Sequence, residues 1–148
     1  MKHLSRALIS LGIVLLATSV YARNVKYLLP INAALQNKDA EERPTGDKKF
    51  FFGKEESPAI ATQLRNDSAY GKASIRNRSD EDACNRAFLS ALVALERRAK
   101  QLGGNAVVNI TSFFKKGAET SSATEFECHA GASAGVGLRG DIVVLKLH

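Results

Sequence analysis

The chain has 148 residues, of which 45% are hydrophobic and 24% are charged. A chain of this length builds one hydrophobic core, which excludes a large multidomain machine. Lysine and arginine total 21 against 15 acidic residues, and a formal charge of +6 is too small to indicate a nucleic-acid partner by itself. We therefore expect one small, mildly basic domain that does not bind nucleic acid.

The N-terminal residues have the pattern of a secretory signal peptide. Lys2 and Arg6 precede an apolar run over residues 7–20, and the small residue Ala22 follows as a cleavage site. The run is shorter than the roughly 20 residues that a transmembrane helix needs, and no second apolar run follows. We expect cleavage after Ala22, export to the periplasm, and no stable membrane insertion once the signal has been removed.

This cleavage divides the chain into a signal peptide, residues 1–22, and a single α+β domain, residues 23–148. The signal carries two bases and no acid, so the domain keeps 19 bases against 15 acids and a formal charge of +4. Such a balance favours solubility and a weak attraction to anionic surfaces.

Two cysteines, Cys84 and Cys128, lie in this domain. An exported protein with an even number of cysteines usually pairs them, and a loop of this size would stabilise the fold by about 4 kcal/mol in the chain-entropy model. Two alternatives stay open. A thiol at a helix start can be redox active, and a metal can be ligated by thiols, although the chain has no Cys-x-x-Cys pair.

Short elements are predicted in the first half of the domain. They are a strand over residues 23–29, one or two helical turns over residues 31–36, a polar surface loop over residues 37–49, an aromatic strand over residues 50–52, and an irregular stretch to about residue 78. Pro30 ends the first strand, and Gly53 closes the aromatic one. Residues 71–78 are a possible further short strand.

The clearest predicted element is a helix from about Asp80 to Leu102. Ser79 is its candidate N-cap, and Gly103 follows its last residue. Apolar residues recur at three- and four-residue spacing and give the helix one face toward a core: Cys84, Phe88, Ala91, Leu92, Leu95, Ala99 and Leu102.

Three strands are predicted after the helix, over residues 105–114, 124–130 and 141–147, with a glycine- and alanine-rich connection over residues 131–140. In the first, Ala106, Val108 and Ile110 are expected on one face. In the second, Cys128 lies on the apolar face that a helix would cover. The expected fold is α+β, with a sheet of three to four strands and one long helix packed on one face.

Glu125, Glu127 and His129 are the candidate metal ligands. They project from one face of a strand in steps of about 7 Å, so they could converge on a metal with help from elsewhere. No second cluster of ligands with recognised spacing accompanies them. A solvated sheet face is therefore the preferred interpretation, and a metal site is the alternative.

Motifs for catalysis or nucleotide binding are missing from the sequence. The glycine-rich residues 131–140 lack the strand, helix and Lys-Ser/Thr ending of a phosphate-binding loop, and no Gly-x-Ser-x-Gly elbow exists. Several bases could touch anionic lipid, peptidoglycan or nucleic acid, but they lack interleaved aromatics and are interpreted as solvated loop residues: Lys72, Arg76, Arg78, Lys115 and Lys116. We expect no catalytic residue and no cofactor.

Most of the domain resembles a family of small exported Gram-negative proteins that often carry the label "excinuclease ATPase subunit". The densest shared motifs are LGGNAVV at residues 102–108 and ECHA at residues 127–130, with LLPINAAL and FFFG also matching. The label does not fit these residues, because the chain has no nucleotide-binding motif.

A more distant similarity is to the YbjQ-like domains and to RcsF, an outer-membrane lipoprotein sensor of envelope stress. There, a helix ends in a Gly-x-Asn-Ala-Val turn, and a cysteine at the helix start is bridged to one on a later strand. Carried over to this sequence, the resemblance implies a disulfide between Cys84 and Cys128. This chain has neither the lipidated N-terminal cysteine nor the second cysteine pair of RcsF.

The sequence therefore predicts a non-enzymatic periplasmic module that acts through protein or cell-envelope contacts, with its sheet face or polar loops as the contact surface. One alternative is a metal-binding or metal-responsive protein that uses Glu125, Glu127 and His129. The others are a component of envelope stress signalling and an enzyme acting on cell-wall or small-molecule substrates.

Overall fold

A computed structural model of the chain describes residues 22–146, so the predicted signal segment up to residue 21 lies outside the described residues. Within them, the elements in chain order are β1 (Val25–Pro30), α1 (Ile31–Leu35), β2 (Lys49–Phe52), β3 (Ile60–Ser74), α2 (Asp80–Leu102), β4 (Ala106–Phe113), β5 (Glu125–Ala130) and β6 (Ser133–Leu145). None of the helices in this part of the chain combines the length and the hydropathy that a membrane crossing requires.

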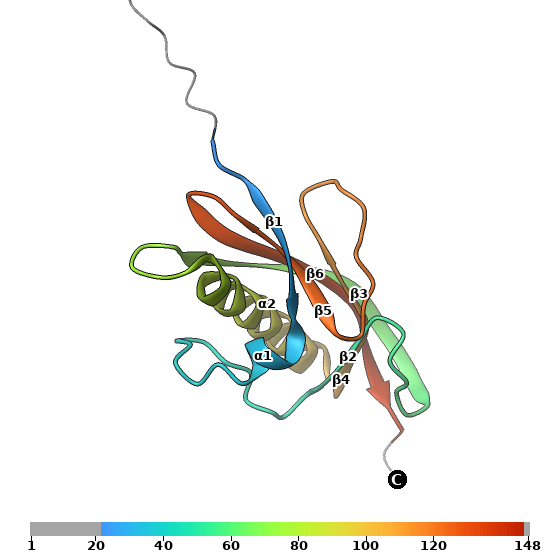
Figure 1. The fold of residues 1–148 in the computed structure, drawn as a ribbon. Helices are drawn as coiled ribbons and strands as arrows, with labels where there is room; N and C mark the ends of the chain where they lie inside the picture. The colour runs from blue at the N-terminus through green and yellow to red at the C-terminus, as the bar shows by residue number, and fades with distance from the viewer. Residues whose placement is uncertain (1–21, 147–148) are drawn as a thin grey trace, which may run out of the picture.

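The six strands form one sheet around a shared strand, β6. Their order is β1-β5-β6-β4-β2, and β3 pairs with β6 along its whole length from Ser133 to Leu145. The opposite edge of β6 is shared, because β5 pairs with its first residues and β4 with the rest. The sheet curls around α2, which packs on one side of it, and α1 lies beside α2 (Figure 1). We call the side away from α2 the outer face.

The predicted sheet of three to four strands is wrong, since the structure has six. One cause is β3, which occupies most of the stretch that was expected to be irregular. Apart from the half-buried Leu64, its first half is mostly exposed on both faces, so it lacks the alternation of apolar and polar residues by which a strand is usually found.

The other cause is the length of β6, which begins at Ser133 rather than at the predicted Asp141. Its glycines suggested a loop, yet they lie inside the strand, and neighbouring atoms approach two of them closely, Gly137 and Gly140. A Cβ atom on Gly140 would lie 2.7 Å from Cγ1 of Val107, and one on Gly137 would lie 2.8 Å from the carbonyl oxygen of Phe113. The glycines therefore allow close strand packing and do not end the strand.

The predicted helix is confirmed as α2, with both ends where the sequence placed them. The Ser79 hydroxyl accepts a hydrogen bond from the backbone N–H of Asp82 at 3.1 Å, and Gly103 adopts the left-handed conformation with φ of 78°. On the buried face, the ring of Phe88 stacks on Phe126 with centroids 4.3 Å apart. The helix thereby fills the concave side of the sheet.

The helix lies unusually close to β3 at Gly71. A Cβ atom there would be 1.8 Å from the carbonyl oxygen of Ala87 and 2.8 Å from the amide nitrogen of Ala91. Because both are backbone atoms of α2, only a residue without a side chain lets the helix rest on the strand at this distance.

A bulge in β4 changes the predicted facing of one residue. Asn109 has φ of 53°, and the pairing with β6 shifts between Val108 and Thr111. Val108 therefore packs on the outer face, whereas Ile110 joins the core under α2. The expectation that Val108 and Ile110 share a face is wrong because the extra residue reverses the alternation.

Cys84 and Cys128 lie at the distance of a disulfide bond, with Sγ atoms 2.05 Å apart. Cys84 lies near the start of α2 and Cys128 in β5, and both side chains are fully buried. The bond joins the start of the helix to the strand beside β1.

Candidate functional site

The strand register brings residues of five strands into two neighbouring rows on the outer face. The first row consists of Tyr70 of β3, Gly137 of β6 and Phe113 of β4. The second consists of Lys72 of β3, Gly135 of β6, His129 of β5 and Lys26 of β1. In both rows, the central strand contributes a glycine, so the middle of the outer face carries no side chain.

Gly135 and Gly137 form the floor of a groove in this face. A Cβ atom on Gly135 would meet no atom within 4 Å, so the space above it is open. Gly137 is covered on one side by the Phe113 ring, whose Cε2 would lie 3.1 Å from such an atom. The floor is therefore flat backbone that opens at Gly135.

The groove has two connected lobes. The apolar lobe has a volume of about 210 Å³, and the more polar lobe has a volume of about 310 Å³. They share Lys72, Phe114, Lys115 and Gly135; Tyr70 closes the apolar lobe, and His129 lines the polar one. We call the surface formed by these six residues the outer groove.

Aromatic rings form the walls of the outer groove. Phe114 stacks on the imidazole of His129, with centroids 3.6 Å apart and an angle of 10° between the rings. Tyr70 stands edge-on to Phe113 at 5.1 Å and keeps 62% of its surface exposed. An exposed ring of this size beside an open floor offers apolar area without belonging to the core.

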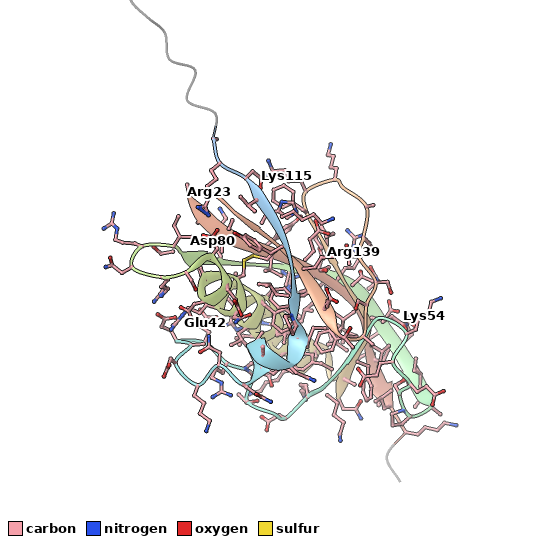
Figure 2. All side chains as sticks on the ribbon, in the orientation of Figure 1. Arg23, Glu42, Lys54, Asp80, Lys115 and Arg139 are labelled. Carbon is pink, nitrogen blue, oxygen red and sulfur yellow. A yellow bond between two sulfur atoms is a disulfide. The ribbon has the colours of Figure 1, made fainter. Side chains whose placement is uncertain are left out.

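Two lysines at the rim of the outer groove have no acidic partner. Among the described residues, Lys72 and Lys115 form no ion pair, and the Lys115 ammonium lies 5.1 Å from the centre of the Phe114 ring. Arg23 also lines the polar lobe, but its guanidinium is bound to Asp80 at the start of α2. Figure 2 shows Arg23 and Lys115 at the end of the molecule where the described chain begins.

The backbone at Lys115 is in the left-handed region, with φ of 52°. This conformation costs a residue with a side chain about 1 kcal/mol relative to glycine. It belongs to a turn closed by a hydrogen bond of 2.9 Å from the Gly117 amide to the Phe114 carbonyl. The turn holds the ring of Phe114 and the ammonium of Lys115 on the same side of the groove.

Beneath the polar lobe, Glu127 and His129 form a bound pair. His129 Nε2 lies 2.7 Å from Glu127 Oε1, and His129 Nδ1 lies 3.1 Å from Asn24 Oδ1. The other oxygen of Glu127 accepts a hydrogen bond of 2.7 Å from the Thr120 hydroxyl and lies 3.7 Å from Nζ of Lys26. Both imidazole nitrogens are thus engaged, which fixes the ring on which Phe114 stacks.

The three candidate ligands on β5, Glu125, Glu127 and His129, do not share one solvated face as expected. Glu125 is exposed, whereas Glu127 is only 5% exposed because the loop that carries Thr120 covers it. Residues 22–146 contain no group of three or more histidine, cysteine, aspartate or glutamate side chains placed to hold a metal ion. Glu127 and His129 come together as a pair, and Glu125 does not join them.

Burial would raise the pKa of Glu127, but the hydrogen bonds from His129 and Thr120 and the charge of Lys26 outweigh it, so the pKa lies below its usual range. The unfolded chain therefore binds more protons than the folded chain at acidic pH. It follows that the stability from this carboxylate is complete above the ordinary pKa of about 4.3 and is lost as the pH falls through the lower folded value.

We predict that Glu127→Gln lowers the free energy of unfolding by about 1–2 kcal/mol at pH 7, through loss of charge-assisted hydrogen bonds. Between pH 5 and pH 3, the free energy of unfolding of the variant should also fall less steeply than that of the parent protein. Urea denaturation across this pH range measures both effects. Glu125→Gln, an exposed position on the same face of β5, is the control and should change stability by less than about 0.5 kcal/mol. Equal pH profiles for Glu127→Gln and the parent protein would contradict this assignment.

A second hollow, of about 250 Å³, lies beside α2 and is lined in part by Glu96. The Glu96 carboxylate accepts hydrogen bonds from the Thr45 amide at 3.0 and 3.1 Å and from the Thr45 hydroxyl at 2.8 Å. These bonds fasten the loop before β2 to the helix. Because the carboxylate is occupied in this way, we assign the hollow a structural role.

Comparisons of the chain with the models of protein families, with curated proteins and with solved structures find no match.

Sequence reasoning missed most of the outer groove. It did not single out Tyr70, Phe114 or Gly135, and it assigned Lys72 and Lys115 to solvated loops. Lys72 in fact lies inside β3, and its neighbours along the groove come from other strands. A usable signal was the spacing of two residues between Tyr70 and Lys72, which places both side chains on one face of a strand.

Proposed function

We propose that this protein is a non-enzymatic periplasmic module that acts by binding, and that the outer groove is its contact surface. The observation that carries the proposal is an open, flat-floored groove with aromatic walls and two lysines that have no acidic partner among the described residues. This narrows the contact surface expected from the sequence to one part of the sheet face.

The arginines that hold elements together differ from the two lysines of the outer groove. The three buried or half-buried arginines on or beside α2 each bind a carboxylate: Arg78 binds Glu41, Arg86 binds Asp82, and Arg98 binds Asp67. On the outer face, Arg139 binds Glu119. These charges hold elements together. Lys72 and Lys115, like several other surface lysines among the described residues, form no ion pair, and they differ from those lysines because both line the outer groove.

The cost of Gly135 is a second support. A glycine in the interior of a strand is less favourable than alanine by roughly 0.5–1 kcal/mol. No neighbouring atom requires the glycine, because a Cβ atom there would meet nothing within 4 Å. The missing side chain leaves the outer groove open, so glycine at this position serves binding and not folding.

Site-specific photo-crosslinking in the cells that make the protein tests the proposal. We would place a photoreactive phenylalanine analogue at Ala132, an exposed residue on the rim of the polar lobe, and in a separate variant at Lys54, which lies away from Lys115 in Figure 2. Adducts are expected at residue 132, and Gly135→Leu, which fills the groove, should remove them. Two results would contradict the proposal. One is adducts at both positions that persist in the Gly135→Leu variant, and the other is the absence of adducts at residue 132.

A further inference from the structure

We infer that the outer groove binds a small anion that carries a flat ring, with the ring on the apolar lobe and the negative group between Lys72 and Lys115. This inference rests on the proposed function and names the class of ligand. It uses the shape of the floor, the chemistry of the walls and the charge at the rim.

The floor and walls fit a ring. Gly135 presents flat, open backbone, the Phe113 ring covers part of Gly137 beside it, and the rings of Tyr70 and Phe114 line the apolar lobe. Phe114 already stacks on His129, so its position is fixed before a ligand arrives. A planar ring of the ligand can meet these side chains face to face or edge to face, which adds to the gain from burying apolar area.

The rim fits a negative charge. Lys72 comes from β3 and Lys115 from the turn after β4. Each of these lysines lines the apolar lobe as well as the polar lobe. Gly135, the open part of the floor, lines both lobes as well, so a ligand whose ring lies over Gly135 has its polar end near the two ammonium groups. The carboxylate nearest to the polar lobe along β5 is Glu127, and it is engaged by His129, Thr120 and Lys26, so it does not neutralise them.

The dimensions favour a small ligand over a membrane surface. The two lobes have volumes of about 210 and 310 Å³, below and at the lower end of the range of small-molecule sites, so only a small ligand fits. A surface that enters a bilayer needs several exposed apolar side chains together, and Tyr70 is the single large one that lines the outer groove in the described part of the chain. The structure thus favours a soluble anion, and an anionic bilayer is the outcome to be tested against it.

Three probes separate the parts of this inference. The first is 1-anilinonaphthalene-8-sulfonate, which has aromatic rings and one negative charge and fluoresces when its rings leave water. The second, N-phenyl-1-naphthylamine, has the same rings without the charge, and the third, inorganic sulfate, has charge without a ring. We expect saturable binding of the first, at least tenfold weaker binding of the second, and no displacement of the first by equimolar sulfate.

Matched variants tie the binding to the outer groove. Lys72→Gln combined with Lys115→Gln should raise the Kd of the sulfonate about tenfold and reduce its dependence on salt, because two ion pairs are lost. Lys116→Gln is the control, since Lys116 is the exposed neighbour of Lys115 and does not line the groove; its Kd should stay within about twofold. Gly135→Leu should abolish saturable binding, and circular dichroism would show that it folds.

The outcomes distinguish the ligand class from the proposed function. Binding that is equal in all four proteins, or equal for the charged and neutral dyes, would overturn the inference and leave the crosslinking result unaffected. Flotation with phosphatidylglycerol vesicles, but no saturable dye binding, would replace the soluble anion by a bilayer surface. Absence of dye binding together with absence of crosslinks at residue 132 would remove both the inference and the proposed function.

Discussion

Replacing both Cys84 and Cys128 with alanine is expected to lower the free energy of unfolding by about 4 kcal/mol. The two residues are 44 apart in sequence, and a crosslink across a loop of this size removes that much loop-closure entropy from the unfolded chain in the chain-entropy model. Alanine is chosen because both sulfur atoms are buried, where a serine hydroxyl would add the separate cost of an unsatisfied polar group. Urea denaturation followed by circular dichroism measures the change.

Reduction of the unaltered protein is the control for this prediction. A reductant opens the same loop without removing either sulfur atom from the core, so its effect isolates the crosslink from the loss of packing. We expect the reduced protein to lie between the oxidised protein and the double variant in stability. If the urea midpoint of the double variant equals that of the oxidised protein, the disulfide has no stabilising role.

The second large effect is expected for Gly71→Ala, which should destabilise the protein by about 3 kcal/mol or more. The added Cβ atom would lie 1.8 Å from the carbonyl oxygen of Ala87. Because that oxygen belongs to the helix backbone, no side-chain rotation relieves the overlap, and α2 has to move away from β3 along its packed length. Thermal and urea denaturation would both report the loss.

Gly135→Ala is the matched control for this variant, since Gly135 lies opposite Lys72, the residue next to Gly71. Its new Cβ atom would point to open space on the outer face. Alanine also lowers the conformational entropy of the unfolded chain, so this change should be neutral or stabilising by up to about 1 kcal/mol. Similar losses for the two variants would show that the close approach of α2 to β3 does not decide the difference.

The parts of the fold that the sequence predicts are those whose signals are local. The start of α2 is marked by the Ser79 side chain bonding the Asp82 amide, and its end by the left-handed Gly103, so both lie within a few residues of what they mark. The strand over Ile60–Ser74 has no such local signal. It forms because β6, far along the chain, supplies its partner, and apart from Leu64 its first half stays mostly exposed on both faces.

The outer groove could not be predicted from the sequence, for a related reason. Its lysines come from β3 and from the turn after β4, and they meet because both strands pair with β6. The alternation in β5 correctly placed Glu127 on the face away from α2, but alternation does not show that the loop holding Thr120 covers that position. Which side chains share a groove depends on pairings between strands that are far apart in sequence.

The central place of β6 has a consequence for how the chain assembles. Of the described strands, β6 comes last along the chain, yet it is the one that β3, β4 and β5 all pair with. During synthesis from the N-terminus, these three strands have no common neighbour until Ser133–Leu145 has been made. Most of the sheet therefore depends on contacts of long sequence separation, which form slowly. The sheet therefore cannot be completed until nearly all of the described residues are available, because the last of the described strands is the shared partner of three earlier ones.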